Sequence, residues 1–169
     1  MNIIPATHAH IPLIHTLAEA IWWPTYQPIL SPEQISFMLE KMYSPGALQE
    51  QMDDGIQFLL VYTDAQQAIA FAGWSVSGEN PEILKIHKLY IMPEQQGKGI
   101  GKMLIRHIEK NAPRQCSILE LNVNRANPAF HFYKKAGFEV YEEVDIPFYE
   151  FFMNDYIMRR AIDRESPSL

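Results

Sequence analysis

The sequence is poor in the features that mark several large classes of protein. It holds one cysteine, Cys116, among 169 residues, so no disulfide can form within the chain. It contains no apolar run of about 18 residues, the length that a membrane-spanning helix requires. The N-terminus lacks the basic segment with which a secretory signal begins. We therefore expect a cytoplasmic protein that has no membrane partner.

An excess of basic residues is also missing. The chain has 14 Lys and Arg against 20 Asp and Glu, and its formal net charge of -6 argues against nucleic acid as a partner, because duplex binding relies on cationic side chains. His8 and His10 lie close together near the N-terminus, but no cluster of cysteines or carboxylates accompanies them. We therefore expect no metal site.

The composition that remains is that of a globular protein. Hydrophobic residues make up 47% of the chain and charged residues 20%, which is enough apolar material to build a core. No internal repeat and no long linker interrupts the sequence. We expect one domain over residues 1–162, followed by a loose tail over residues 163–169.

Hydrophobic spacing and helix-start signals predict an alternation of strands and helices. We expect strands over residues 2–5, 56–63, 68–77, 84–91, 119–124, 139–143 and 154–160. We expect helices over 8–22 and 100–111, after Ser31-Pro32 and Ser44-Pro45, and after Asn127-Pro128, where the polar residue is the N-cap and proline the first helical residue. This order predicts an α+β fold with a mixed, mostly antiparallel central sheet and helices on both faces.

A glycine-rich loop lies between an expected strand and an expected helix. Residues 96–101 read Gln-Gly-Lys-Gly-Ile-Gly, and such a turn before a helix start can cradle a diphosphate with its free N–H groups. The P-loop pattern fails, because Lys102 is followed by Met103 rather than Ser or Thr. The dinucleotide pattern fails because the glycines have the wrong spacing. Taken alone, the loop is equally well explained as an ordinary strand-to-helix turn.

A second motif follows about thirty residues later. Asn127, Ala129, Tyr133 and Gly137-Phe138 match the pattern N-x-A-x-x-x-Y-x-x-x-G-F. With Gln96, Gly99 and Gly101, this series resembles the two signatures of the GNAT acetyltransferase family, in the family's order and separation. The resemblance covers residues 84–140. It implies the GNAT fold, acetyl-CoA as the cofactor, and transfer of the acetyl group to a primary amine by direct attack in a ternary complex.

The resemblance also implies which residues hold the cofactor. The backbone of the strand before the loop would bind the pantetheine arm, and the loop amides would bind the diphosphate with help from the helix dipole. The candidate cofactor-binding residues are Leu89, Tyr90, Ile91, Gln96, Gly97, Lys98, Gly99, Ile100, Gly101, Lys102, Asn127, Phe130, Tyr133 and Lys135.

Two residues are candidates for the proton transfers of such a reaction. Tyr133 is the candidate general acid, because a phenol with a pKa of about 10 can protonate a departing thiolate; a packed helix tyrosine is the alternative. His87 is the candidate base, since it lies two residues before Leu89 on the same strand face. Related enzymes often carry glutamate here, so a carboxylate, a water relay and a merely packed histidine stay open as alternatives.

The acceptor side is the least defined part of the sequence. Trp23, Tyr26 and Asn122 are the candidate substrate-binding residues, and the two aromatic rings would clamp an alkyl amine from a position between the first two helices. Asp145 and Glu150 would supply an acidic rim. Residues 143–158 resemble bacterial spermidine/spermine-type acetyltransferases, so we expect a small-molecule amine, with a polyamine as the candidate.

Two other functions are compatible with the same motifs. One is acetylation of peptide or protein N-termini, which needs a groove rather than an acidic slot. The other is a catalytically silent acyl-CoA-binding module, which the missing glutamate would permit. The sequence leaves open whether the protein forms a homodimer.

Overall fold

A computed structural model of the chain describes residues 1–164. These residues cluster in two compact units. Unit 1 comprises Met1–Trp74 and Lys88–Gly101, and unit 2 comprises Ser75–His87 and the chain from Lys102 onward. The expected single domain over residues 1–162 stays a prediction, and residues 165–169 of the expected tail lie outside the described residues.

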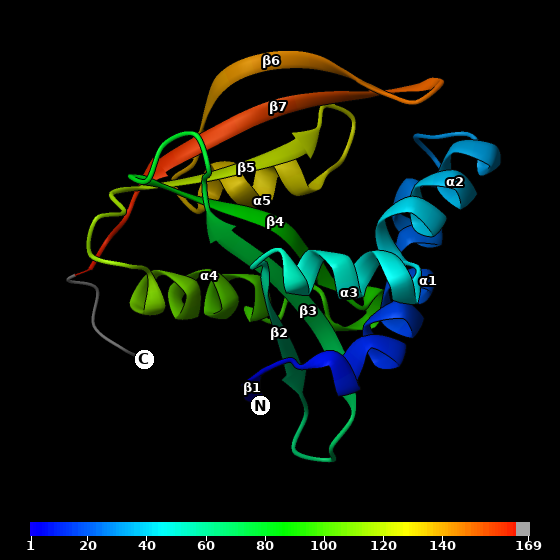
Figure 1. The fold of residues 1–169 in the computed structure, drawn as a ribbon, viewed down its shortest axis with the longest axis horizontal. Coiled ribbons are helices and arrows are strands. Elements are labelled where there is room, and N and C mark those ends of the chain that lie inside the picture. Colours follow the sequence, from blue (N-terminus) through cyan, green and yellow to red (C-terminus); the bar gives the residue numbers. More distant parts are fainter. Residues whose placement is uncertain (165–169) are drawn as a thin grey trace. The chain divides into compact units, whose positions relative to one another are not determined.

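The strands pair in the order β1-β2-β3-β4-β5-β7-β6 (Figure 1). Their bounds are β1 Asn2–Pro5, β2 Gln57–Tyr62, β3 Ala68–Val76, β4 Ile83–Ile91, β5 Ile118–Asn124, β6 Glu139–Phe148 and β7 Phe151–Ala161. β4 and β5 run parallel, whereas β1 with β2, β2 with β3, β5 with β7 and β6 with β7 run antiparallel. The expected mixed, mostly antiparallel sheet is confirmed.

The bounds of the helices are η1 His8–His10, α1 Ile11–Tyr26, α2 Pro32–Tyr43, α3 Pro45–Asp53, η2 Pro93–Gln95, α4 Ile100–Asn111 and α5 Ala129–Lys135. Helices α2 and α3 begin after the predicted capping residues, Ser31 and Ser44. The hydroxyls of Ser31 and Ser44 accept hydrogen bonds from the amides of Gln34 and Ala47, at 3.1 and 3.3 Å. Each serine thus satisfies one of the free N–H groups at its helix start.

Helix α1 is longer than the hydrophobic pattern predicted. It ends at Tyr26 rather than at residue 22 and contains Pro24 in its last turn. A proline removes only its own N–H from the helical hydrogen bonds, and the neighbouring Thr25 hydroxyl donates to the Ile21 carbonyl at 2.7 Å. Trp23 and Tyr26 therefore lie on the helix itself and not on the connection after it.

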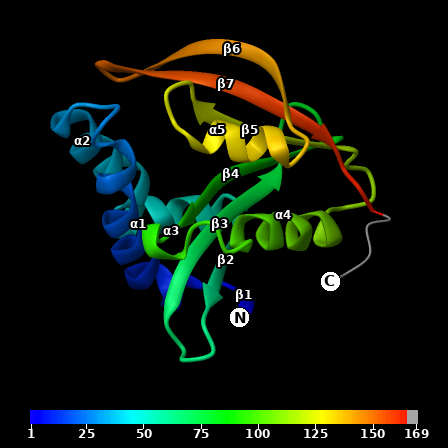
Figure 2. The same cartoon turned by 180° about the vertical axis from the view of Figure 1, so that it is seen from behind.

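In unit 1, helices α1, α2 and α3 contact one another beside the β1–β3 strands (Figures 1 and 2). The core of this unit contains an aromatic cluster of Trp22, Tyr26, Tyr43, Phe71 and Tyr90. Ring centroids within the cluster are 4.4 to 6.5 Å apart, which is the normal range for packed aromatic pairs.

One lysine is buried against this cluster. Lys88 of β4 is 6% exposed, and its Nζ lies 5.0 Å from the centroid of the Tyr43 ring and 6.0 Å from that of Phe58. Burial lowers the pKa of Lys88 from 10.5 to about 8, because the apolar surroundings disfavour the ammonium form. The ring faces offset only part of this cost.

Replacing Lys88 with methionine is expected to stabilise the protein at pH 7. One pKa unit corresponds to about 1.4 kcal/mol, so the buried ammonium costs roughly 3 kcal/mol, reduced by about 1–2 kcal/mol of lost contact with the rings. The folded-state pKa lies below the unfolded one, so wild-type stability rises between pH 8 and pH 10.5. Urea unfolding should therefore show a gain for Lys88→Met at pH 7 that shrinks toward pH 10.5.

Lys41 provides the matched control for this experiment. It is an exposed lysine whose Nζ lies 5.7 Å from the Phe37 ring centroid, so Lys41→Met removes a similar contact without relieving a buried charge. We expect a small effect on the free energy of unfolding. A Lys88→Met variant that is less stable than wild type at pH 7 would show that the ammonium has a stabilising role.

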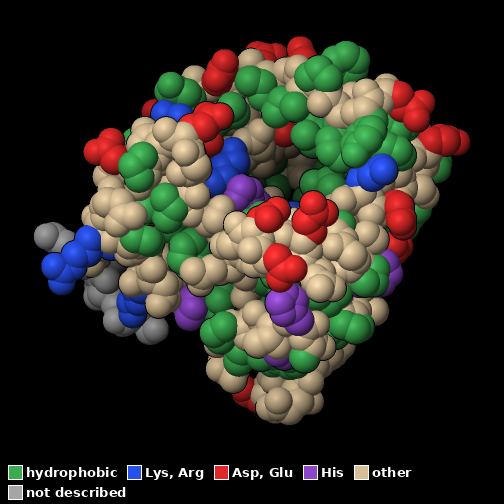
Figure 3. Space-filling model, in the orientation of Figure 1, with side chains coloured by type: hydrophobic (Ala, Val, Ile, Leu, Met, Phe, Trp, Pro, Cys, Tyr) green, Lys and Arg blue, Asp and Glu red, His purple; other side chains and the backbone are tan. Residues whose placement is uncertain are grey.

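In unit 2, the β6–β7 hairpin is longer than predicted. β6 reaches Phe148 instead of residue 143, β7 begins at Phe151 instead of residue 154, and Tyr149 at the turn has φ of 57°. β6 is the last strand of the sheet, and most of its side chains are exposed on both faces. Figure 3 shows acidic and hydrophobic side chains together along this edge. The residues that the prediction left out, 144–148, alternate between exposed and half-buried side chains, and they include Pro147, a residue that sheets tolerate mainly on edge strands.

The two sheet faces of unit 2 differ in character. Leu119 and Leu121 of β5 are buried on one face, where Arg160 donates to the Ala136 carbonyl after α5 at 2.8 Å and pairs with Glu109 of α4. The opposite face carries charged and amide side chains.

Within residues 1–164, none of the helices combines the length and apolar character needed to cross a bilayer.

Candidate active site

The glycine loop leads into α4 with an exposed backbone. Gly97 and Gly99 have φ of 79° and 82°, in the left-handed region that strains other residues. A Cβ added at either position would have no described protein atom within 4 Å, so the space above the loop is open. Gln96 anchors the loop, because its Nε2 donates to the Ile91 carbonyl at 3.2 Å. This arrangement fits an anionic ligand held by backbone amides at a helix start.

Two exposed lysines lie in and next to the loop. Lys98 is exposed, and its Nζ donates to Gln95 Oε1 at 3.3 Å, while Lys102 is exposed on the first turn of α4. Ile100 and Gly101 are buried and fix the helix start. The loop thus combines open amides, a helix N-terminus and two cationic side chains.

Strand β4 extends beyond the stretch in which it pairs with β5. In the described residues, this register runs from Ile83 opposite Ile118 to Ile86 opposite Leu121, although β4 continues to Ile91. Leu89 and Ile91 are half-buried in the continuing stretch. Side chains alternate along a strand, and Tyr90 accordingly turns to the other face, where its hydroxyl lies 3.0 Å from that of Tyr26.

The aromatic residues expected at the acceptor side occupy different environments. Tyr26 is buried at 8% exposure in the cluster with Trp22 and Tyr90, whereas Trp23 is half-buried. The Trp22 indole N–H and the Tyr43 hydroxyl are both buried in this cluster. Burial raises the pKa of Tyr43 well above its usual value. Of the predicted pair, the structure thus places Tyr26 in the packed core.

Tyr133 is fixed by the end of helix α5. The Phe138 amide donates to the Tyr133 carbonyl at 3.0 Å, and the Gly137 amide donates to the Lys134 carbonyl at 3.1 Å, with Gly137 at φ of 94°. These two bonds form a Schellman motif, which confirms the predicted glycine stop. The motif folds Phe138 back so that its ring lies 5.8 Å from that of Tyr133, which is 8% exposed.

The start of α5 differs by one residue from the expectation. The helix begins at Ala129, and Pro128 takes the N-cap position rather than the first helical one. Asn127 is buried, and its side-chain oxygen accepts from the Ala129 amide at 2.9 Å. This local Asx turn shifts the capping contact by one residue. Phe130 packs 5.3 Å from the Tyr156 ring, and Lys135 is exposed.

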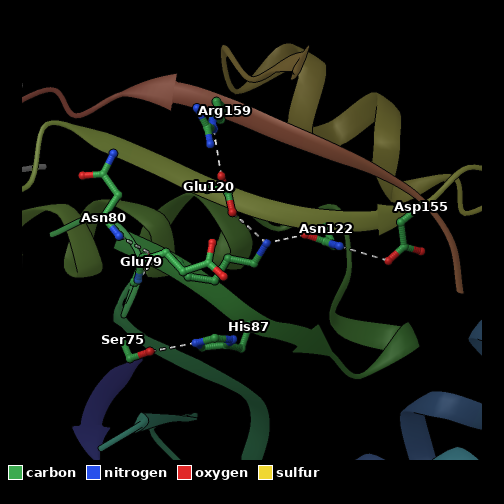
Figure 4. Close-up of polar contacts among 10 residues, drawn as sticks. Ser75, Glu79, Asn80, His87, Glu120, Asn122, Asp155 and Arg159 are labelled. Carbon is green, nitrogen blue, oxygen red and sulfur yellow. Dashed lines mark hydrogen bonds and ion pairs between the residues drawn. The ribbon is translucent and has the colours of Figure 1, made fainter. Parts of the chain in front are cut away.

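The polar face of unit 2 carries a chain of charge-assisted hydrogen bonds (Figure 4). Lys85 of β4 donates to Glu120 at 3.1 Å and also to the side-chain oxygen of Asn122. Glu120 accepts from Arg159 at 2.8 Å as well. Burial alone would raise the pKa of Glu120, but Lys85 and Arg159 outweigh it and hold that pKa below its usual range.

The chain continues from Asn122 to Asp155 of β7. The Asn122 amide nitrogen donates to Asp155 Oδ2 at 3.3 Å, and Asp155 is 8% exposed. Burial raises the pKa of Asp155, and the Asn122 hydrogen bond and the charges of Lys85 and Arg125 reduce that rise. The predicted residue Asn122 therefore lies between a lysine and a buried aspartate.

His87 lies on the same face and is exposed. Its Nε2 is 2.8 Å from the Ser75 hydroxyl, as Figure 4 shows, so an imidazole and a hydroxyl are in position to share a proton. At the expected acidic rim, the Asp145 carboxylate is already paired with a cation. It is bound by Arg125 at 2.7 Å, and Glu143 contacts the same guanidinium at 3.3 Å.

Sequence reasoning did not single out Asp155 or Lys85. The signal was present in the strand alternation, because Lys85, Glu120, Asn122, Asp155 and Arg159 all occupy one face of neighbouring strands. Among residues 1–164, no three His, Cys, Asp or Glu side chains come together as a metal site.

A comparison with known families decides the class of this protein. Residues 26–147 match the acetyltransferase (GNAT) domain, which is well over half of the chain. The chain belongs to the GNAT acetyltransferase family. As a member of that family it is an acetyl-CoA-dependent N-acetyltransferase, and the two sequence signatures that predicted this class are confirmed.

Individual relatives agree with this assignment. The spermidine N(1)-acetyltransferase of Thermoplasma acidophilum is 34% identical over 155 residues, which cover 87% of this chain and 88% of the relative. The PaiA N-acetyltransferase of the same organism, crystallised with coenzyme A, superposes with a TM-score of 0.78 at 27% identity, over 95% of this chain and 99% of PaiA. A ribosomal-protein-alanine N-acetyltransferase of Brucella melitensis shares the fold alone, with a TM-score of 0.64 at 18% identity over 95% and 99% of the chains.

Proposed function

We propose that this GNAT acetyltransferase acetylates a primary amine of a small molecule and that polyamines are its acceptor class. The observation that carries the proposal is the 34% identity to a spermidine N(1)-acetyltransferase over 87% of the chain. The similarity extends over nearly the whole of both proteins. A buried carboxylate on the polar face of unit 2 further favours a cationic acceptor.

The loop residues would hold the cofactor, which supplies the acetyl group as a thioester. The amides of residues 97–101 would donate to its diphosphate, and the α4 N-terminus would add the positive end of its dipole. Lys98 and Lys102 would contribute charge, and the backbones of Leu89 and Ile91 would bind the pantetheine arm. The roles expected of Tyr90, Asn127, Phe130 and Lys135 stay predictions.

The reaction also needs two proton transfers, one to the departing sulfur and one from the incoming ammonium group, and side chains would perform them. We assign the proton for the departing sulfur to the Tyr133 hydroxyl, since the Schellman motif orients its ring. We assign the proton of the incoming ammonium to His87, whose contact with Ser75 offers a way to pass it on. Glu120 is a poor candidate base because Lys85 and Arg159 already bind both of its oxygens.

An amine panel tests the proposed function. Purified protein with acetyl-CoA is offered putrescine, spermidine, spermine, n-butylamine and peptides with free N-termini, and released thiol is measured. We expect turnover of the polyamines with kcat/KM values that differ visibly with chain length, since one methylene in an apolar slot is worth about 1–3 kcal/mol.

Three results would contradict the proposal in different ways. Turnover of the peptides alone would identify an N-terminal acetyltransferase. Binding of acetyl-CoA without thiol release for any acceptor would identify a silent acyl-CoA-binding module. Turnover of n-butylamine with no preference for any polyamine would support amine acetylation but contradict the proposal that polyamines are the acceptor class. The cytoplasmic location, the absence of a nucleic-acid partner and the homodimer stay predictions.

A further inference from the structure

We propose that Asp155 binds the second ammonium group of a diamine or polyamine acceptor, the one that is not acetylated. The inference rests on the proposed function, because it requires an acceptor with at least two amino groups. It assigns a specificity-determining contact to a residue that neither family signature includes.

Among the described residues, Asp155 is a buried carboxylate of the polar face that has no ion pair, whereas Glu139 and Glu142 of β6 are exposed to solvent. Glu120, on the same face, is bound by Lys85 at 3.1 Å and by Arg159 at 2.8 Å. Lys85 and Arg159 are therefore both committed to Glu120. Among the described residues, Asp155 accepts a side-chain hydrogen bond from Asn122 alone, at 3.3 Å.

The burial of Asp155 makes this arrangement costly. The residue is 8% exposed, and a buried carboxylate without a paired charge is destabilising unless donors replace its lost hydration. One neutral amide at 3.3 Å replaces only part of that hydration. An ammonium group would supply both the missing charge and strong hydrogen-bond donors. Such uncompensated groups are typical of binding sites rather than of structural ion pairs.

Next to Asp155, the chemistry of the reaction favours the amine that is not acetylated over the amine that attacks the thioester. A carboxylate stabilises the ammonium form, whereas the attacking nitrogen must lose its proton. His87 on β4, the proposed base, shares the face with Asp155 on β7, and β5 separates the two strands (Figure 4). Two strand spacings amount to about 10 Å across a sheet. The face therefore offers separate positions for a neutral amine and for an ammonium group.

Lys85 lies between these two positions on the polar face. Its Nζ contacts Glu120 and Asn122, so its charge is offset by Glu120. Its bond to the Asn122 oxygen fixes the amide so that the Asn122 nitrogen points to Asp155. Lys85 thus orients the side chain that holds the carboxylate.

A pair of matched acceptors tests the inference. The kcat/KM values for putrescine and for n-butylamine are measured with wild type and with Asp155→Asn, a substitution of nearly equal shape. We expect the variant to lower the putrescine value by about 10- to 100-fold, chiefly through KM, because it loses one charged contact. The n-butylamine value, the KM for acetyl-CoA and the Tm should stay close to wild type. Asp64→Asn makes the same chemical change at an exposed site and should alter none of these values.

A second variant keeps the test decisive if Asp155→Asn does not fold. Asp155→Glu retains the charge and moves it by one methylene, so we expect the preferred diamine to become shorter, from putrescine toward 1,3-diaminopropane. An unchanged length preference would then overturn the inference.

The outcomes separate this inference from the function on which it rests. An equal fall for putrescine and n-butylamine would identify Asp155 as a base or a structural residue and overturn the inference. Wild-type kcat/KM values that are equal for the two amines would overturn it as well and leave amine acetylation intact. If wild type acetylates no amine at all, the proposed function fails and the inference fails with it.

Discussion

Replacing Tyr133 with phenylalanine is expected to lower kcat by about 10²- to 10⁴-fold, the usual worth of a general acid. The ring should keep its place, because the Schellman motif uses the Tyr133 backbone carbonyl and the packing against Phe138 involves the ring carbons. The substitution therefore removes the hydroxyl group and keeps the ring. Steady-state kinetics should show this fall with a nearly unchanged KM for acetyl-CoA.

A matched control removes a phenolic proton elsewhere in unit 2. Tyr141 is 59% exposed, and its ring stacks on the Arg159 guanidinium, with 3.6 Å from that group to the ring centroid. Tyr141→Phe keeps the ring and should leave kcat within about twofold of wild type. If Tyr133→Phe also retains full kcat under conditions where the chemical step limits turnover, Tyr133 is a packing residue.

The fold was largely predictable because its signals are local. Ser31 and Ser44 cap the helices that follow them, α4 spans the predicted residues 100–111, and Gly137 ends α5 as expected. The predictions failed where local signals are weak or misleading. Helix α1 continues through Pro24 to Tyr26 instead of ending at residue 22, and β6 continues to Phe148 through Pro147, a residue that strand interiors rarely contain.

The sequence predicted the parts of the candidate site that backbone conformation determines. It did not predict the parts that side-chain pairing between neighbouring strands determines. The spacing of Gly97 and Gly99 predicted the loop, whose positive φ angles then explained the glycines. Pairing of charges is a property of the assembled sheet, so the sequence could not show that Arg125 binds Asp145. It also could not show that Lys85 and Arg159 both bind Glu120, or that Asp155 accepts its side-chain hydrogen bond from the Asn122 amide.

Replacing Gly99 with valine is expected to abolish acetyl-CoA binding while the protein still folds. A β-branched residue at φ of 82° is strained by about 1–3 kcal/mol, and the added side chain would extend into the open space above the loop, where the diphosphate is expected. Ligand at 100 times its Kd stabilises a native protein by about 2.7 kcal/mol. Wild type should therefore gain several degrees in Tm with saturating acetyl-CoA, and Gly99→Val should gain nothing.

Gly78→Val separates the loop's role from a general effect of the substitution. A Cβ at Gly78 also has no described atom within 4 Å, and Gly78 is not among the glycines with positive φ, so valine there is neither strained nor crowded. This variant should keep the full acetyl-CoA-induced rise in Tm. Calorimetric titration gives the Kd values directly. If Gly99→Val binds acetyl-CoA as tightly as Gly78→Val, the diphosphate does not lie on this loop, and the roles proposed for residues 97–101 fall together.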